Sequence, residues 1–388
     1  KTILGGLTPA GFLREYWQKR PLLVRQAFPG FQSPFTPEEL AGLACEEGVA
    51  GRILIEHGKT PWELRHGPFR ERDFRRLPAT HWTLLVTDMD RHRPELRAWM
   101  EPFRFIPDWR IDDLMVSYAA PGGSVGPHID AYDVFLIQAH GRRRWQISER
   151  PVAPDNRIPG IDLDIMRRFR AEQTWVLEPG DMLYLPPNVA HYGVAQDDCM
   201  TWSVGFRAPA ERDLVAAWME DRLQHVDPCA RYGDADLRPA RHPGQIDDAA
   251  IRRLKDILNQ ALAGDDAALE RWFGRFVTEP KTEDHDHEPV SARRVRSLLD
   301  GLVKGKPLHR EPAARFAWRM VGDHLYFFAD GVEYVLAPSL RPLAETLCAG
   351  FDYPAGQLSA TLADAAGREL LAGLIRQGCL QPGGLLEY

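Results

Sequence analysis

Cysteines are few in this chain of 388 residues, and they are widely separated. No two of them are spaced as in a CxxC motif, which excludes a zinc ribbon and a thioredoxin-type redox motif. Their odd number and scattered positions do not favour a disulfide framework. We therefore interpret them as small buried hydrophobic residues of a protein from a reducing compartment. They are Cys45, Cys199, Cys229, Cys348 and Cys379.

Long apolar runs and an excess of basic residues are also absent. No stretch reaches the roughly 20 apolar residues that a membrane-spanning helix needs, and no signal-peptide pattern is recognisable. The expectation is a soluble, cytoplasmic protein. The formal net charge of -7 argues against a general nucleic-acid binder, because such a protein needs positive charge to displace counterions from phosphates. A mildly acidic protein suits a basic partner instead.

Between residues 50 and 207 the chain is a series of short β-rich runs separated by proline and glycine. This spacing is typical of an antiparallel sandwich or barrel, and we predict a small jelly-roll barrel. Helix-start patterns at Thr8-Pro9 and Thr36-Pro37 precede it. The predicted strands are residues 52–56, 82–86, 114–119, 134–138, 143–147, 174–177, 182–185 and 201–206.

An HxD pattern formed by His128 and Asp130 is the main candidate for metal binding. In an extended strand, side chains two residues apart point to the same face, so both ligands would face one metal ion. His191 follows the apolar strand 182–185 on a predicted loop and would be the third ligand. Two imidazoles and one carboxylate leave three adjacent coordination positions open, as in non-haem Fe(II) oxygenases. HxD patterns also arise by chance, so other residues must support this interpretation.

Arg143 provides such support. On a strand it shares one face with Trp145 and Ile147, whereas Arg142 and Arg144 share the other. An inward arginine among apolar neighbours would be a buried unpaired charge unless an anion meets it. A dicarboxylate cosubstrate could bind the guanidinium through one carboxylate and chelate the metal through its keto-acid end. The alternative is that these arginines only coat the surface.

The remainder of the chain is predicted to be mostly helical. Helices are expected over residues 211–226, 246–263 and 265–277. The apolar stripe of the second could pack on the barrel or on the other helices, but we favour a homodimer interface. Helices and hairpins after residue 291, with Asp330-Gly331 as a turn, resemble a winged-helix module. The basic residues between positions 293 and 310 of this module could bind DNA. We favour protein contacts instead and expect no direct nucleic-acid binding.

We accordingly divide the chain into four parts. They are a barrel domain with N-terminal helices over residues 1–207, a helical dimerisation region over 208–278, a linker over 279–290 and a winged-helix-like domain over 291–388. The linker contains His285 and His287, which we do not assign to a metal site because a polar loop offers no preorganised geometry.

Taken together, these patterns resemble the JmjC-type bacterial ribosomal oxygenases, and among them the ribosomal protein arginine hydroxylases. The likeness rests on the HxD…H set, on Arg143, and on four runs that together with the domain order span nearly the whole chain. The runs are EYWQKRPLLVRQAF, DDLMVSYAAPGGSVGPHID, YDVFLIQAHGRRRW and EPGDMLYLPPNVAHYG.

The resemblance implies a jelly-roll barrel of the cupin and JmjC class that uses Fe(II), 2-oxoglutarate and O2. It implies hydroxylation of an arginine β-carbon in a large-subunit ribosomal protein, number sixteen in bacteria. His128, Asp130 and His191 would hold iron, and Arg143 would bind 2-oxoglutarate. Independently of the resemblance, the hydroxyl of Ser117 could also donate a hydrogen bond to 2-oxoglutarate. The residues implied to line the substrate arginine pocket are Asp113, Met115, Tyr132 and Ser203.

Part of that pocket also follows from the residues themselves. Asp113, Met115 and Ser117 alternate onto one face of a predicted strand, where a carboxylate can pair with a guanidinium. Met115 and Tyr132 can contact the aliphatic stem. A structural role for Asp113 at the barrel rim remains open.

Other activities remain alternatives: a histidyl hydroxylase, a lysine demethylase of the JmjC class, a cupin-type sugar isomerase, or a non-catalytic cupin regulator that binds nucleic acid through its winged helix. A demethylase would need an aromatic cage rather than a carboxylate.

Overall fold

The computed structural model describes residues 3–57, 62–160, 163–240, 242–281, 290–354 and 356–383. The chain forms two compact units, residues 1–208 and 209–388, which are described separately below. Among the described residues, no helix is both long and apolar enough to cross a membrane.

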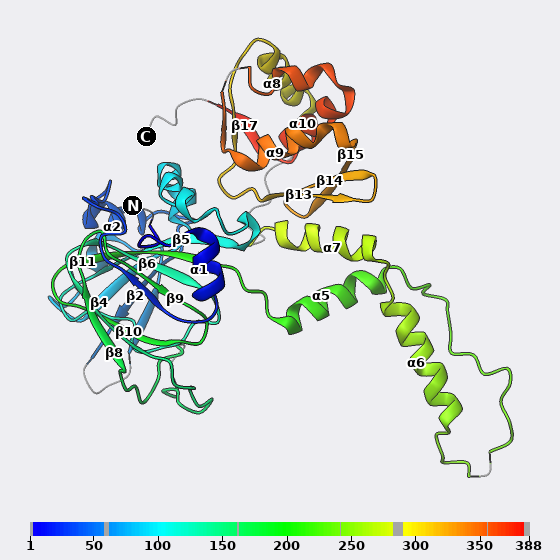
Figure 1. The fold of residues 1–388 in the computed structure, drawn as a ribbon, viewed down its shortest axis with the longest axis horizontal. Coiled ribbons are helices and arrows are strands. Elements are labelled where there is room, and N and C mark those ends of the chain that lie inside the picture. The colour runs from blue at the N-terminus through cyan, green and yellow to red at the C-terminus, as the bar shows by residue number, and fades with distance from the viewer. Residues whose placement is uncertain are drawn as a thin grey trace. The chain divides into compact units, whose positions relative to one another are not determined.

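The first unit is built on two antiparallel sheets (Figure 1). The larger has the order β1-β9-β6-β11-β5-β4-β2-β3, and the smaller has the order β10-β7-β8. This arrangement confirms the predicted jelly-roll barrel. The strands are β1 (Leu22–Val24), β2 (Gly51–Ile55), β3 (Glu63–His66), β4 (Trp82–Val86), β5 (Ile111–Ala119), β6 (Val134–His140), β7 (Arg143–Ser148), β8 (Gln173–Leu177), β9 (Met182–Leu185), β10 (Ala190–Ala195) and β11 (Cys199–Phe206).

In the larger sheet, both faces of the central strands β6, β9 and β11 are buried. Along β11, Trp202 and Val204 belong to a core that also contains Phe12 and Leu40 from the N-terminal helices. The side chains that alternate with them, including Thr201 and Ser203, face the smaller sheet across the barrel interior. The interior is partly filled by a second apolar cluster drawn from both sheets. Because the outer face supplies much of the apolar core, the inner face can hold polar residues.

The N-terminal helices α1 (Pro9–Glu15) and α2 (Pro37–Leu43) begin as predicted. The hydroxyl of Thr8 accepts a hydrogen bond from the backbone N–H of Gly11, at 3.1 Å. Thr36 and Glu39 form a reciprocal capping box, because the side chain of each accepts the backbone N–H of the other. Two short helices, α3 (Glu71–Phe74) and α4 (Met89–His92), lie between the strands.

The second unit contains helices followed by a module of helices and hairpins (Figure 1). Its helices are α5 (Glu211–Leu223), α6 (Asp248–Leu262), α7 (Asp266–Thr278), α8 (Ala292–Val303), α9 (Arg341–Ala349) and α10 (Ala365–Arg376). Its strands form the sheets β13-β14-β15 and β16-β12-β17. Their bounds are β12 (Leu308–Arg310), β13 (Phe316–Val321), β14 (His324–Ala329), β15 (Val332–Leu336), β16 (Asp352–Tyr353) and β17 (Leu380–Pro382).

The Asp330-Gly331 turn joins β14 to β15, as predicted. Both residues have positive φ angles, +46° and +77°, which matches the two-residue turn that fits the twist of a hairpin. This hairpin, the helices α8 and α10 and one shared apolar core make up the winged-helix module.

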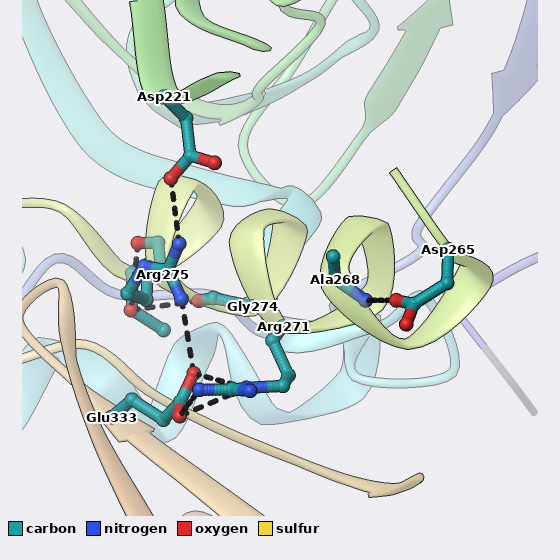
Figure 2. A network of polar contacts seen from close by, with 8 residues as sticks. Asp221, Asp265, Ala268, Arg271, Gly274, Arg275 and Glu333 are labelled. Carbon is teal, nitrogen blue, oxygen red and sulfur yellow. Dashed lines mark hydrogen bonds and ion pairs between the residues drawn. The ribbon is translucent and has the colours of Figure 1, made fainter. Parts of the chain in front are cut away.

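Helix α7 is tied to the winged-helix module and to α5 through a group of charged residues that we call the α7 arginine network (Figure 2). Arg275 donates to the carboxylates of Glu333, at 3.0 Å, and of Asp221, at 2.8 Å. Arg271 forms a bidentate pair with Glu333, with hydrogen bonds of 2.6 to 3.1 Å. The helical region and the winged helix thus lie in one compact unit.

Most of the predicted linker lies outside the described residues, including His285 and His287. The division of the second unit into a dimerisation region, a linker and a winged helix therefore stays a prediction.

Candidate metal centre

His128, Asp130 and His191 come together at the barrel interior. Each offers one ligand atom, and the three atoms lie within 4.8 Å of one another. The Nε2 atom of His128 is 3.9 Å from Asp130 Oδ1, and that of His191 is 3.5 Å from Asp130 Oδ2. Three atoms at such separations can face a single ion.

The backbone that carries these ligands differs from the prediction. His128 and Asp130 do not lie on a strand but in the connection between β5 and β6. His191 lies on β10 and not on a loop. A two-residue bridge joins the segments, because the backbone N–H of His128 donates to His191 O (3.0 Å) and the reverse bond is 2.9 Å. The connection curves back to meet β10, so two distant segments are fixed at the ligands themselves.

Backbone carbonyls orient both imidazoles. Nδ1 of His128 lies 2.9 Å from Gly126 O, and Nδ1 of His191 lies 2.9 Å from Val189 O. A carbonyl can only accept, so Nδ1 carries the proton in each ring and Nε2 presents its lone pair. Burial, assisted by the neighbouring His128, lowers the pKa of His191 to about 4. The neutral form is the one that binds a metal, so the donor set fits a divalent ion.

The metal-binding loop is supported from outside by residues 163–166. Ile165 and Met166 are buried, and the backbone N–H of Met166 donates to Pro127 O at 2.7 Å. Gly126 has a φ of +79°, and a Cβ there would lie 2.8 Å from Ile165. Glycine is therefore required both by backbone conformation and by the close approach of this segment.

Arg143 is buried on the inner face of β7, as the alternation predicted. Only 2% of its surface is exposed, whereas Arg142 and Arg144 on the opposite face are exposed. Its Nη2 donates to Gly193 O at 3.2 Å, and its Nη1 makes a long contact of 3.5 Å with the hydroxyl of Ser117. Burial lowers the pKa of Arg143.

No carboxylate pairs with Arg143 among the described residues, and its Nε has no hydrogen-bond partner there. A buried cation with only neutral partners is costly, so the geometry calls for an anion inside the barrel. The metal centre and Arg143 belong to the same wall, since His191, Gly193 and Ala195 pair in register with Ile147, Trp145 and Arg143.

The residues predicted to line a substrate pocket lie on neighbouring strands. Met115 is directly opposite Ser203 in the β5–β11 pairing, and Ser117 is opposite Thr201. Asp113 is on the same face of β5, and its Oδ2 accepts the backbone N–H of Asp88 at 3.0 Å. The structure therefore brings Asp113, Met115, Ser117 and Ser203 onto one inner surface.

Tyr132 follows Asp130 in the β5–β6 connection and is 42% exposed. The pKa of Tyr132 is raised by burial of its hydroxyl and, in addition, by the nearby carboxylates of Asp130 and Asp113. The phenol is therefore neutral and lies close enough to the metal ligand Asp130 to interact with it.

Two contributors were missed in the sequence. Gly193 leaves space for Arg143, because a Cβ there would lie 2.7 Å from Arg143 Nε and from the Trp145 ring. Asp88 positions Asp113 through a backbone with a φ of +55°. An isolated glycine in the run Ala190–Ala195 is a signal for close approach. Nothing in the sequence marks Asp88, because its role rests on a backbone N–H.

Comparison with known families gives two matches. A JmjC domain model matches residues 98–214, which include the metal centre, and a ROXA-like winged helix model matches residues 258–381.

Relatives match over nearly the full length. The chain is 37% identical over 367 residues to the ribosomal protein uL16 3-hydroxylase of Escherichia coli, covering 95% of both chains. The solved structure of the E. coli ribosomal oxygenase YcfD superposes with a TM-score of 0.81 at 35% identity, covering 98% of this chain and 99% of YcfD. A structure of YcfD with cobalt and 2-oxoglutarate gives a TM-score of 0.82 at 35% identity, again covering 98% and 99%. The chain belongs to this family of JmjC ribosomal oxygenases with a ROXA-like winged helix.

Proposed function

We propose that this protein is an Fe(II)- and 2-oxoglutarate-dependent oxygenase that hydroxylates an arginine β-carbon of ribosomal protein uL16. One observation supports this assignment above the others. Arg143 is a buried cation without a carboxylate partner among the described residues, on the same wall as a set of two histidines and one aspartate. A keto-diacid has the two ends that these two groups require.

The proposed roles follow from the contacts. His128, Asp130 and His191 hold the metal, and the carbonyls of Gly126 and Val189 keep both rings oriented toward it. Arg143 binds the distal carboxylate of 2-oxoglutarate, and Ser117 adds a hydroxyl beside it. Bound iron would supply the activation of O2 and the oxidation of the substrate carbon. The apolar cluster of the barrel interior excludes water from the reacting groups.

For the substrate, a carboxylate is the group that best recognises a guanidinium. We propose that Asp113, held by the backbone N–H of Asp88, pairs with the substrate arginine. Met115, Ser203 and the exposed ring of Tyr132 would contact its stem. A carboxylate at this position favours arginine over a methylated lysine, which aromatic rings would surround.

The decisive experiment is mass spectrometry of a uL16 peptide incubated with enzyme, Fe(II), 2-oxoglutarate and O2. We expect one added oxygen on one arginine. Asp113→Asn should reduce peptide hydroxylation about 10- to 100-fold, because the charge of the carboxylate that pairs with the guanidinium is lost. His128→Ala serves as the control that removes all turnover. Hydroxylation of a histidine instead of an arginine, or no added oxygen on the uL16 peptide, would contradict the proposal.

We further propose that the protein acts in the cytoplasm as a homodimer through α6, and that the winged helix makes protein contacts rather than binding nucleic acid. The apolar stripe of α6 is open in the single chain, with Leu254 47% and Leu258 50% exposed. An apolar face of this kind is costly in water and marks an interface. Leu254→Glu should shift the mass measured by light scattering from two chains to one. A wild-type mass of one chain would refute the dimer.

A further inference from the structure

Two buried N–H groups on the inner face of β7 have no hydrogen-bond partner among the described residues. One is Nε of Arg143, and the other is Nε1 of Trp145. Trp145 is only 4% exposed, so water does not compensate its donor from the surface. Leaving a buried donor unpaired destabilises the fold, so each such group in a native structure calls for an explanation.

Trp145 lies between the metal centre and Arg143. Its ring centroid is 6.0 Å from that of His191 and 5.1 Å from the guanidinium carbon of Arg143. Gly193 is directly opposite in the β10–β7 pairing, and a Cβ there would lie 2.7 Å from the indole. The indole therefore occupies the wall along which a molecule linking metal and guanidinium would extend.

Trp202 offers a contrast within the same sheet system. Its Nε1 is also buried and has no hydrogen-bond partner in the described part of the chain. Its ring, however, packs on the outer face of the larger sheet against Phe31, Phe35 and Trp99. No charged group or metal ligand is among these neighbours. An unpaired indole alone thus does not indicate a ligand, and the position of Trp145 is what distinguishes it.

We infer that the indole N–H of Trp145 donates a hydrogen bond to the bound 2-oxoglutarate and so positions it together with Arg143. This inference rests on the proposed function, which supplies the cosubstrate. Arg143 neutralises charge at the distal carboxylate, whereas a donor from Trp145 would fix the chain of the keto-diacid between the guanidinium and the metal ligands. A hydrogen bond to a charged oxygen is stronger than one between neutral groups.

The test compares 2-oxoglutarate binding to wild type, Trp145→Phe and Trp202→Phe. Each protein is loaded with Mn(II) and titrated anaerobically in a calorimeter. Phenylalanine keeps an aromatic ring and removes the N–H. We expect about a tenfold rise in Kd for Trp145→Phe, the loss of one hydrogen bond to a charged group. Trp202→Phe should bind as wild type. Equal affinity of Trp145→Phe and wild type would overturn the inference, as would equal weakening by Trp202→Phe.

A second measurement keeps the inference testable if Trp145→Phe does not fold. In 15N-labelled wild type, the indole N–H resonance of Trp145 should move downfield when 2-oxoglutarate is added, and that of Trp202 should stay in place. An unshifted Trp145 resonance at saturation would overturn the inference. If wild type fails to bind 2-oxoglutarate at all, the proposed function itself fails, which is a different outcome from equal binding by wild type and variant.

Discussion

Two arginines in this molecule, Arg275 and Arg143, differ in the groups that they contact. Arg275 in the α7 arginine network donates to Glu333 and Asp221, which lie on two other elements of its unit (Figure 2). Arg143 in the barrel is more deeply buried, yet among the described residues its hydrogen bonds reach a carbonyl and a hydroxyl and no carboxylate. Carboxylates of the protein neutralise the first charge, whereas no carboxylate in the described part of the chain neutralises the second.

The difference indicates what each residue is for. A paired cation holds elements together, and removing it leaves its carboxylates close to one another. A buried cation without an anion destabilises the fold. A ligand that supplies the anion removes this destabilisation, and the free energy recovered increases the affinity for that ligand. The same residue type therefore has a structural role at α7 and a binding role in the barrel. Substitutions at both sites can test this distinction.

Replacing Arg143 by leucine should have the largest effect on binding. We expect the affinity for 2-oxoglutarate to fall by about 100-fold or more, because two charge-assisted hydrogen bonds are lost. The midpoint temperature of thermal unfolding should stay the same or rise, because burying leucine does not require the desolvation of a charge. Calorimetric titration and thermal unfolding measure the two quantities. A large fall in the midpoint would show that Arg143 is structural.

Replacing Arg143 by lysine should have a smaller effect in the same direction. An ammonium keeps the charge but cannot form the bidentate pair, so we expect the KM for 2-oxoglutarate to rise about tenfold. Steady-state turnover at varied 2-oxoglutarate measures this change. If the KM of the lysine variant equals that of wild type, the distal carboxylate binds at another group.

Replacing Arg275 by leucine should change stability and leave binding untouched. We expect the free energy of unfolding to fall by about 1–3 kcal/mol, because Glu333 and Asp221 are mostly buried and lose a charged donor. The KM for 2-oxoglutarate should not change. Denaturant unfolding of the full chain provides the measurement.

A matched control is Arg319→Leu. Arg319 on β13 pairs with Glu270, which lies on helix α7. Because the side chain of Arg319 is 55% exposed, we expect this substitution to lower the free energy of unfolding by about 0–1 kcal/mol. Equal losses for Arg275→Leu and Arg319→Leu would remove the distinction between the network and an ordinary surface pair.

Much of the fold could be predicted from local pattern. Most strands of the barrel, though not β3 or β10, were predicted in this way. The capped helices at Thr8 and Thr36 and the Asp330-Gly331 turn likewise depend on residues close in sequence. Period-two alternation also predicts that Arg143 faces inward, which agrees with its burial on β7. These features are determined locally, because strand pleating, capping and turn conformation involve only a few neighbouring residues.

The candidate site was only partly predictable. The HxD…H set identified the three ligands, but it did not show that His128 and Asp130 lie on a connection or that His191 lies on a strand. The path of such a connection depends on backbone hydrogen bonds to β10, a strand that is distant in sequence.

The sequence by itself determined the residue types of the site and the face on which Arg143 would lie. Only the tertiary structure decided which charges have partners. Arg143 and Arg275 are the same residue in sequence, and they differ because long-range packing brings carboxylates to one and none of the described carboxylates to the other. Pairing of side chains across distant elements depends on strand register and helix packing, which a local pattern does not contain.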